Sequence, residues 1–334
     1  MKLSDLDYAY PEELVALKPG RPSRVAYVEG LKPPKEIDLL TLLDHFSPGD
    51  LLVVNETEVT PARVFSLNET EILFLRALDR TEWQVLFPAR DYKLGAVIEL
   101  PGNVSLRLKE KGLPQVVETS HELGPQYFQE HGEFALPPYI QEARGQRRNL
   151  KEDREWYQSA WAKIPGSVAA PTASLHFNED HLNELRAKGV GVQTLTLHVG
   201  AGTFLPVRSE NLDEHQMHSE PVTIPSQTLA NIRSAQAQGA RVWALGTTVA
   251  RSLEAWAAGD LQQNPDGSVS GETRIFIRPP FEFEVVNGLL TNFHQPRSTL
   301  LSLVAAFAGL EKVKATYAWA IARRFRLFSY GDLS

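Results

Sequence analysis

Residues 196–204 combine a titratable side chain with a turn that lets a ligand approach the backbone. An apolar, strand-like run ends in His198, and Gly200, Gly202 and the hydroxyl of Thr203 follow it. Glycine has no Cβ, so backbone amides at such a turn can lie close to a bound molecule. A neutral imidazole beside them is suited to take up a proton near pH 7. The segment therefore predicts His198 as a general base and Gly200, Gly202 and Thr203 as substrate-binding residues.

Two further apolar runs end in a histidine, His176 in one and His294 in the other. A single histidine of this kind is more often structural, but three at similar strand ends indicate a site. We expect the three imidazoles to line one pocket, and a catalytic role is open to each of them. Phe177 and Phe293 lie beside two of these histidines, so packing explains both nearly as well. The carboxylate of Glu220 is an alternative base.

The sequence Gly246-Thr247-Thr248 lies between a predicted strand and a predicted helix. Hydroxyls and free amides at the start of a helix suit a small polar or anionic group. A plain tight turn explains the same residues equally well. The glycines at 200–202 do not form a dinucleotide-binding fingerprint, because the third glycine is absent and Pro206 prevents a helix from starting there.

No motif in the sequence completes a familiar metal site or nucleophile. His215, His218 and Glu220 are the best candidate ligands for a metal, yet no cysteine or second paired motif completes the set. The serines lack the Gly-x-Ser-x-Gly turn of serine hydrolases. We expect a protein without a bound metal.

Basic residues cluster in two short stretches of a chain whose net charge is −7. Arg144, Arg147 and Arg148 lie in the first stretch, and Arg324 lies in the second, near the C-terminus. An acidic protein has no general attraction to nucleic acid, so such a partner must be held by a local patch. We expect these four arginines to contact RNA phosphates. The alternative for residues 144–151 is a solvated linker.

The bulk composition is that of a globular protein, with 334 residues, 43% apolar residues and 22% charged residues. This length is sufficient for two domains. The sequence has no cysteine, no apolar run of membrane-spanning length and no signal-peptide pattern at its start. We expect a cytoplasmic protein that is a monomer or a weak homo-oligomer and has no membrane partner.

The elements that must position these side chains divide the chain into two types of segment. The apolar run 51–54 predicts a buried strand, and short strands separated by turn residues predict a small barrel or sandwich over 64–119. From about residue 155 the pattern alternates between strands and helices, with helix starts at Asn178, Ser226, Gly246 and Ser298.

We therefore expect an α/β fold interrupted by an inserted all-β barrel. The α/β catalytic domain is discontinuous and comprises residues 1–63 and 151–334, whereas residues 64–150 form the barrel domain. Near the C-terminal end of the α/β domain, the pair Asn287-Gly288 favours a type I′ hairpin.

Motifs along nearly the whole chain resemble the S-adenosylmethionine:tRNA ribosyltransferase-isomerase family of queuosine biosynthesis. Several motifs are long and unusual in composition, so a chance match is negligible. The matching segments are 5–11, 52–57, 61–63, 136–140, 157–158, 165–177, 196–208, 217–220, 246–248, 291–294, 296, 298–300 and 328–332.

The resemblance implies an unusual reaction on tRNA. The ribosyl part of S-adenosylmethionine is transferred to 7-aminomethyl-7-deazaguanine at the wobble position and rearranged, which gives epoxyqueuosine and releases adenine and methionine. S-adenosylmethionine is thus a co-substrate, and neither a cofactor nor a metal is required. Within the matching motifs, Asn292 joins Thr247 and Thr248 as a candidate contact to S-adenosylmethionine.

The sequence departs from the family pattern in several places, among them Ser167, Ser174 and Leu327, and two further departures bear on function. Glu58 stands where the family usually has an arginine, and the sequence ends two residues after Asp332, whereas relatives commonly continue. These departures are the features that favour an alternative function, an RNA-binding α/β protein of the same fold that has lost the activity.

Overall fold

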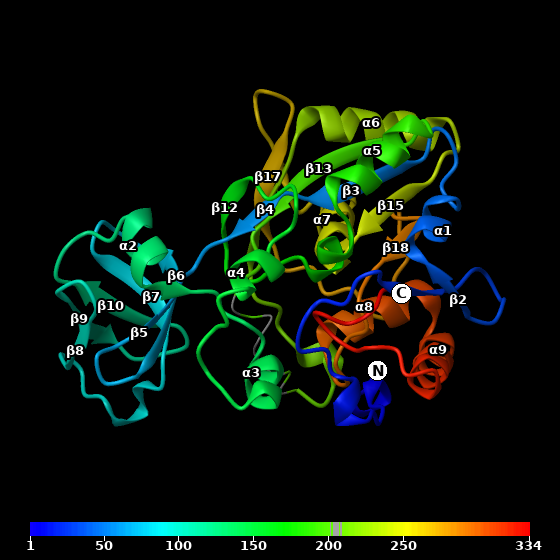
Figure 1. The fold of residues 1–334 in the computed structure, drawn as a ribbon. Coiled ribbons are helices and arrows are strands. Elements are labelled where there is room, and N and C mark those ends of the chain that lie inside the picture. Colours follow the sequence, from blue (N-terminus) through cyan, green and yellow to red (C-terminus); the bar gives the residue numbers. More distant parts are fainter. Residues whose placement is uncertain (201, 203–206, 208) are drawn as a thin grey trace.

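The computed structural model describes residues 1–200, 202, 207 and 209–334. Figure 1 shows two parts of unequal size, the smaller drawn mainly in cyan and blue-green. The larger part contains most of the helices, and both chain ends lie on it.

A mixed seven-stranded sheet forms the centre of the larger part. Its four parallel strands are β13 (Gly191–Leu197), β3 (Leu51–Asn55), β15 (Val242–Leu245) and β18 (Gly288–Leu290). Three antiparallel strands extend it, namely β14 (Glu220–Ile224), β17 (Val269–Thr273) and β16 (Gln262–Gln263). The strand order is β16-β17-β14-β13-β3-β15-β18. The prediction that the strand at 51–54 belongs with the later α/β segments is confirmed.

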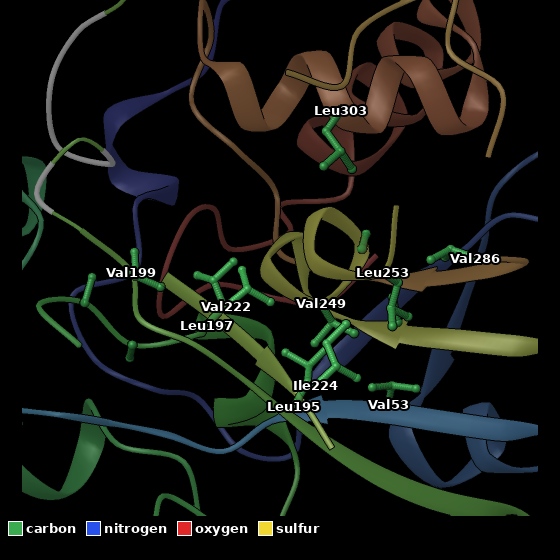
Figure 2. Close-up of a cluster of buried hydrophobic side chains, with 14 of the residues drawn as sticks. Val53, Leu195, Leu197, Val199, Val222, Ile224, Val249, Leu253, Val286 and Leu303 are labelled. Carbon is green, nitrogen blue, oxygen red and sulfur yellow. The ribbon is translucent and has the colours of Figure 1, made fainter. Parts of the chain in front are cut away.

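Strand β3 is buried on both faces, because helices cover the sheet from either side. Leu51 and Val53 pack in one cluster with α6 (Ser226–Ala237) and α7 (Thr247–Ala257), and Figure 2 shows Val53 among side chains of this cluster. Leu52 and Val54 lie in a second cluster with α1 (Leu39–Leu43) and α5 (Glu179–Ala187). A strand covered on both faces needs apolar residues at every position, which explains the unbroken apolar run in the sequence.

The predicted helix starts in the larger part are confirmed. Asn178 precedes α5 and accepts a hydrogen bond from the backbone amide three residues on. Ser298 caps α8 (Thr299–Ala308) in the same way. Helix α6 begins at Ser226, and α7 begins at Thr247 directly after Gly246. Such caps satisfy amides that have no partner within the first turn. Helix α9 (Leu310–Ala322) follows α8.

The smaller part is a curled antiparallel sheet. Its strands are β11 (Gly132–Glu133), β5 (Arg63–Phe65), β6 (Glu71–Ala77), β7 (Glu82–Leu86), β10 (Gln115–Thr119), β9 (Val104–Glu110) and β8 (Val97–Leu100), in this spatial order. Beyond the paired strands, the amide of Leu67 donates a hydrogen bond to the carbonyl of Glu99 at 2.9 Å, so the β5 and β8 regions approach each other. Between residues 63 and 119, all of which are described, the only helix is the three-residue η3 (Ala89–Asp91). The prediction of a strand-rich segment without a long helix is confirmed there.

Two short helices make the expectation of an all-β segment wrong for part of residues 64–150. These are α2 (Pro125–His131) and α3 (Pro138–Arg144). Both have a proline at the first helical position, where its missing N–H has no intrahelical partner to lose. The helices are too short to give a clear apolar period in the sequence.

The hairpin predicted at Asn287-Gly288 is also wrong. Strand β18 begins at Gly288 and pairs in parallel with β15. Asn287 forms hydrogen bonds with Val242 through both its backbone and its side chain, at 2.8 and 2.9 Å. A Cβ at Gly288 would lie 2.2 Å from the ring of Trp243. The glycine therefore permits a close approach of the indole instead of a turn.

Smaller elements complete the larger part. Strands β1 (Arg24–Tyr27) and β2 (Lys35–Asp38) form an antiparallel hairpin, and β4 (Thr57–Val59) pairs in parallel with β12 (Ile164–Ser167). The remaining helices are η1 (Leu3–Leu6), η2 (Glu12–Leu14), α4 (Asp153–Trp156), η4 (Thr172–His176) and η6 (Leu212–Glu214). In the described part of the chain, no helix has the length and apolar character needed to cross a membrane.

Candidate active site

The parallel strands bring the predicted site segments to one edge of the main sheet. His198 follows β13, Thr247 follows β15 and Asn292 follows β18, so each lies just past the carboxyl end of its strand. Thr57 follows β3, which lies between β13 and β15. After β3, the next strand along the chain in this sheet is β13, on one side of β3, and the later strand β15 lies on its other side. The order in which strands are added to the sheet therefore reverses direction at β3. Ligands of open α/β sheets bind at the carboxyl edge beside such a reversal.

The imidazole of His198 is fixed at one ring nitrogen. Its Nδ1 lies 2.8 Å from Oγ1 of Thr57, and within the described residues no group forms a hydrogen bond with its Nε2. The side chain is half-buried, and burial lowers its pKa below the usual value for histidine. The ring is therefore neutral at pH 7. When Nδ1 donates to the threonine hydroxyl, Nε2 carries the lone pair that accepts a proton.

Strand β12 packs against this ring through Gly166. A Cβ at Gly166 would lie 2.9 Å from Cε1 of His198 and 3.1 Å from each ring nitrogen. The residue also has a φ of +144°, which glycine adopts readily and other residues rarely do. The neighbouring Ser167 accepts a hydrogen bond from the amide of Val199 at 2.9 Å. Strand β12 thus holds the imidazole from one side.

His176 is buried and has a partner at each ring nitrogen. Its Nδ1 lies 2.6 Å from Oγ of Ser23, and its Nε2 lies 3.1 Å from Nδ2 of Asn292. Burial is the main cause that lowers its pKa to about 4. The ring is therefore neutral at pH 7, and it orients the carboxamide of Asn292.

His294 is buried as well and anchors the segment after β18. Its Nε2 lies 2.8 Å from Oγ1 of Thr291, and burial lowers its pKa to about 3. Its backbone amide donates to the hydroxyl of Tyr317 at 3.0 Å, and its carbonyl accepts from the hydroxyl of Tyr8. These contacts describe a residue integrated into the core.

The three histidines therefore have different surroundings. His176 contacts Asn292, two residues before His294, so two of the predicted segments meet directly. His198 is held instead by β4 and β12 through Thr57 and Gly166. That all three rings line one pocket stays a prediction.

The first turn of α7 carries Thr247 and Thr248 to the same edge. Gly246 precedes it with a φ of +97°, and no side chain caps the first amides of the helix. The Oγ1 atom of Thr248 is buried, and none of the described residues forms a hydrogen bond with it. This turn therefore keeps unused donors, as the prediction of a polar or anionic ligand requires.

The described part of the glycine turn after β13 contacts β14 and the residues before it. The amide of Gly200 donates to Oε1 of Glu220 at 3.1 Å. A Cβ at Gly202 would lie 2.5 Å from Cδ2 of His218, so the turn passes very close to that ring. Thr203, the third predicted residue of this turn, lies outside the described residues.

Arg251 is a charged residue of this region that the sequence patterns missed. Its Nη1 donates to Oε2 of Glu220, and the two side chains are 7% and 5% exposed. The Nε and Nη2 atoms of Arg251 are buried and have no hydrogen-bond partner in the part of the chain that the structure describes. In the sequence, Arg251 is the only charged residue of the otherwise mainly apolar segment 249–253 and lies three residues after Thr248. This pattern is the signal that would have identified it.

Asn55 is a second residue that was missed, and it fixes the geometry at the end of β3. Its carboxamide donates to the carbonyl of Leu197 at 2.9 Å and accepts from the amides of Leu197 and Thr57, both at 3.1 Å. The side chain is fully buried. It therefore connects the ends of β3 and β13 and sets Thr57 beside His198. An asparagine directly after a buried strand is the signal in the sequence.

The possible metal ligands have other partners. Glu220 is bound to Arg251, and His215 packs edge-on against Phe276. Within the described ranges, no group of three histidine or carboxylate side chains is arranged to hold a metal ion.

The four predicted RNA-contacting arginines fall into two kinds. The side chain of Arg147 is 59% exposed and forms an ion pair with Glu71. The side chain of Arg148 is 48% exposed and forms ion pairs with Glu69 and Glu133. Arg324 is 68% exposed and lies 3.5 Å from Glu13.

Arg144 is different, because its side chain is only 7% exposed. It binds both carboxylate oxygens of Asp153, at 2.7 and 2.9 Å, and the carbonyl of Leu17. This guanidinium holds the end of α3 in place, so we leave Arg144 out of the RNA-contacting set.

Comparison with known proteins places the chain beside enzymes that act on tRNA. The model of a family described as "Queuosine biosynthesis protein" matches residues 3–334. A relative from Dinoroseobacter shibae is 40% identical, and one from Acidiphilium cryptum is 42% identical. Each alignment covers 100% of this chain, and 98% and 99% of the respective relative. Both relatives are named S-adenosylmethionine:tRNA ribosyltransferase-isomerase.

A solved structure is similar in fold as well as in sequence. The crystal structure of S-adenosylmethionine tRNA ribosyltransferase from Thermotoga maritima has 29% sequence identity and a TM-score of 0.55 to this chain. The match covers 98% of both chains.

Proposed function

The chain belongs to the queuosine biosynthesis protein family, and from this premise we propose that it is an S-adenosylmethionine:tRNA ribosyltransferase-isomerase. It transfers the ribosyl part of S-adenosylmethionine to 7-aminomethyl-7-deazaguanine at the wobble position of tRNA and rearranges it to epoxyqueuosine. The observation that carries the proposal is the similarity over the whole chain to relatives with this name. It supports this function over an RNA-binding protein that has lost the activity.

His198 is the residue best placed to act as the base. The sulfonium of S-adenosylmethionine acidifies the neighbouring C5′ hydrogens, so a neutral imidazole can remove one of them. His198 is half-buried, and Thr57 orients its Nδ1. His176 and His294 are buried, the first with both ring nitrogens and the second with Nε2 bound to other side chains, so we assign them positioning roles.

The residues around His198 are the proposed contacts to S-adenosylmethionine. They share the carboxyl edge of the parallel strands, where backbone amides and small hydroxyls are available to a ligand. The set comprises Gly200, Gly202, Thr203, Thr247, Thr248 and Asn292.

The tRNA is proposed to bind across both parts of the molecule. Residues 64–150 form an inserted β-barrel domain in this proposal, and the hydrogen bond between Leu67 and Glu99 supports closure of the curled sheet. The discontinuous α/β domain, residues 1–63 and 151–334, is the catalytic one. Exposed Arg147 and Arg148 of the insertion and Arg324 of the catalytic domain are the phosphate contacts. Action on tRNA supports a cytoplasmic location as part of this proposal.

The proposed function is tested by release of adenine. The protein is incubated with S-adenosylmethionine and tRNA that carries 7-aminomethyl-7-deazaguanine, and free adenine is measured together with the modified nucleoside. We expect adenine, methionine and modified tRNA in equal amounts, and no adenine with tRNA that carries guanine instead. Binding of the modified tRNA without any release of adenine would establish the alternative.

A further inference from the structure

Three buried hydrogen-bonding atoms near the first turn of α7 have no partner among the described residues. They are Oγ1 of Thr248 and the Nε and Nη2 atoms of Arg251. Residues three apart on a helix share a face, and helical side chains lean toward the N-terminus. The Arg251 side chain is more than nine-tenths buried, and the first amides of α7 have no side-chain cap. Unsatisfied buried donors are costly, so their concentration at one helix start indicates a ligand.

The free atoms of Arg251 form one edge of its planar guanidinium. Because Nη1 is bound to Glu220, the remaining Nε and Nη2 groups point away from that carboxylate on a shared edge. Two parallel N–H groups on such an edge match the two oxygens of a carboxylate. The hydroxyl of Thr248 adds a third donor.

The charge of the surroundings selects a singly charged anion. Glu220 is itself a buried carboxylate and lies in direct contact with Arg251. A doubly charged phosphate beside it would be repelled strongly at low dielectric, whereas a carboxylate shares the guanidinium and the positive end of the helix dipole.

We propose that Arg251 and Thr248 form a subsite for the α-carboxylate of S-adenosylmethionine. The identity of the ligand rests on the proposed function, since S-adenosylmethionine is the substrate that carries such a group. Glu220 joins this subsite to the glycine turn, because it binds Arg251 with one oxygen and the amide of Gly200 with the other. Anchoring of the methionine end is thereby coupled to the turn that follows His198.

The test compares two ligands that differ in the carboxylate. S-adenosylmethionine and decarboxylated S-adenosylmethionine are titrated calorimetrically into the full-length protein. Arg251→Lys keeps a cation beside Glu220 but removes the guanidinium edge, and Thr248→Val removes one donor at nearly constant volume. We expect Arg251→Lys to weaken S-adenosylmethionine binding by about tenfold or more and Thr248→Val by a smaller factor. The affinity for the decarboxylated ligand should change by less than about twofold.

The matched control is Thr316→Val, because Thr316 is a similarly buried threonine of a helix, α9, outside this site. It should leave both affinities unchanged. If Arg251→Lys lost equal affinity for both ligands, Arg251 would have a purely structural role and the subsite proposal would be overturned. An Arg251→Lys variant that still prefers S-adenosylmethionine over the decarboxylated ligand as strongly as the parent would also overturn it. Adenine release by the parent protein is measured in parallel. If the parent enzyme releases adenine but the variants do not show the expected loss of affinity, the proposed function stands and the subsite proposal is overturned.

Discussion

A catalytic base must be neutral, oriented, free at one nitrogen and accessible to its substrate, and among the three histidines only His198 is not fully buried. Thr57 contacts its Nδ1, and burial lowers its pKa without enclosing the ring completely. His176 and His294 are neutral too, but both are buried. His176 contacts Ser23 and Asn292 through its two ring nitrogens, and His294 contacts Thr291 through Nε2.

Replacement of His198 by asparagine tests this assignment. Asparagine keeps a polar group near Thr57 but cannot accept the proton, so turnover should fall by about 10²-fold or more. The affinity for S-adenosylmethionine should change little. Burial lowers the pKa of His198 below the usual histidine value of about 6.5, so the rate of the parent should decline only when the pH falls below that value. The rate of the variant should not show this decline. Adenine release across a pH series measures both effects.

The control for this variant is His121→Asn, since His121 is exposed at the end of the smaller sheet. Its rate and pH profile should match those of the parent. A His198→Asn enzyme within a few-fold of the parent rate would remove His198 from the role of base.

The buried histidines predict how stability depends on pH. Burial lowers the pKa of His294 to about 3, whereas the unfolded chain has the usual value. Between these values the unfolded state binds more protons, so the free energy of unfolding decreases as the pH falls below about 6.5. His294 alone contributes about 2 kcal/mol of this loss between pH 6.5 and 5.

Urea unfolding of the parent and of His294→Gln at pH 7 and pH 5 measures this contribution. The variant should lose less stability than the parent between the two pH values, because glutamine does not titrate. Equal losses in the two proteins would contradict a neutral His294 in the folded state.

At the level of residues, the sequence identified side chains but not their surroundings. His198, Thr247, Thr248 and Asn292 stand out because their types and neighbours are unusual, and the sheet does bring them to one edge. Arg251 was missed because its meaning depends on Glu220, which lies 31 positions away. For Arg144, nothing in a basic stretch of sequence reveals its buried carboxylate partner Asp153.

Strand β12 makes a prediction at the level of elements. An alanine at Gly166 would push a Cβ into the ring of His198, at 2.9 Å from Cε1, and would strain a backbone with φ of +144°. Gly166→Ala should therefore lower turnover by displacing the base, about as strongly as removal of the base itself. Adenine release at saturating S-adenosylmethionine and modified tRNA provides the measurement.

Gly259→Ala is the matched control, because Gly259 also has a positive φ of +80° but no atom lies within 4 Å of its added Cβ. It shares the backbone strain without the collision, so it should cost some stability and leave turnover unchanged. Equal turnover in the two variants would show that contact between β12 and His198 does not matter for the reaction.

Elements with local signals were predictable, and those set by distant contacts were not. Capping by Asn178 and Ser298 is local chemistry, so the starts of α5 and α8 were predicted correctly. The pair Asn287-Gly288 carries the same local signal as a hairpin turn. Its real role comes from Val242 and Trp243, which reach it only after the sheet has formed.

For the whole molecule, binding of tRNA should depend on a local patch despite the net charge of −7. Replacement of Arg147 and Arg148 by alanine should weaken tRNA binding and reduce its dependence on salt, because fewer counterions are released. Binding isotherms at several salt concentrations, with thermal unfolding as a check of the fold, measure the effect.

A control double variant, Arg80→Ala with Arg107→Ala, removes the same charge from other parts of the smaller sheet and should leave the salt dependence unchanged. If the variant without Arg147 and Arg148 also binds tRNA with the salt dependence of the parent, these arginines do not contact tRNA. They then serve only in the ion pairs with Glu69, Glu71 and Glu133.

The order of the strands along the chain has a consequence for synthesis on the ribosome. All strands of the smaller sheet lie between residues 63 and 133, so that sheet has its full set of partners early. Strand β3 is made before it, yet its partners are residues 191–197 and 242–245. At ordinary rates of translation this interval is on the order of ten seconds. The nascent chain must therefore keep the apolar row Leu51–Val54 from pairing wrongly until the strands on both sides of it have emerged.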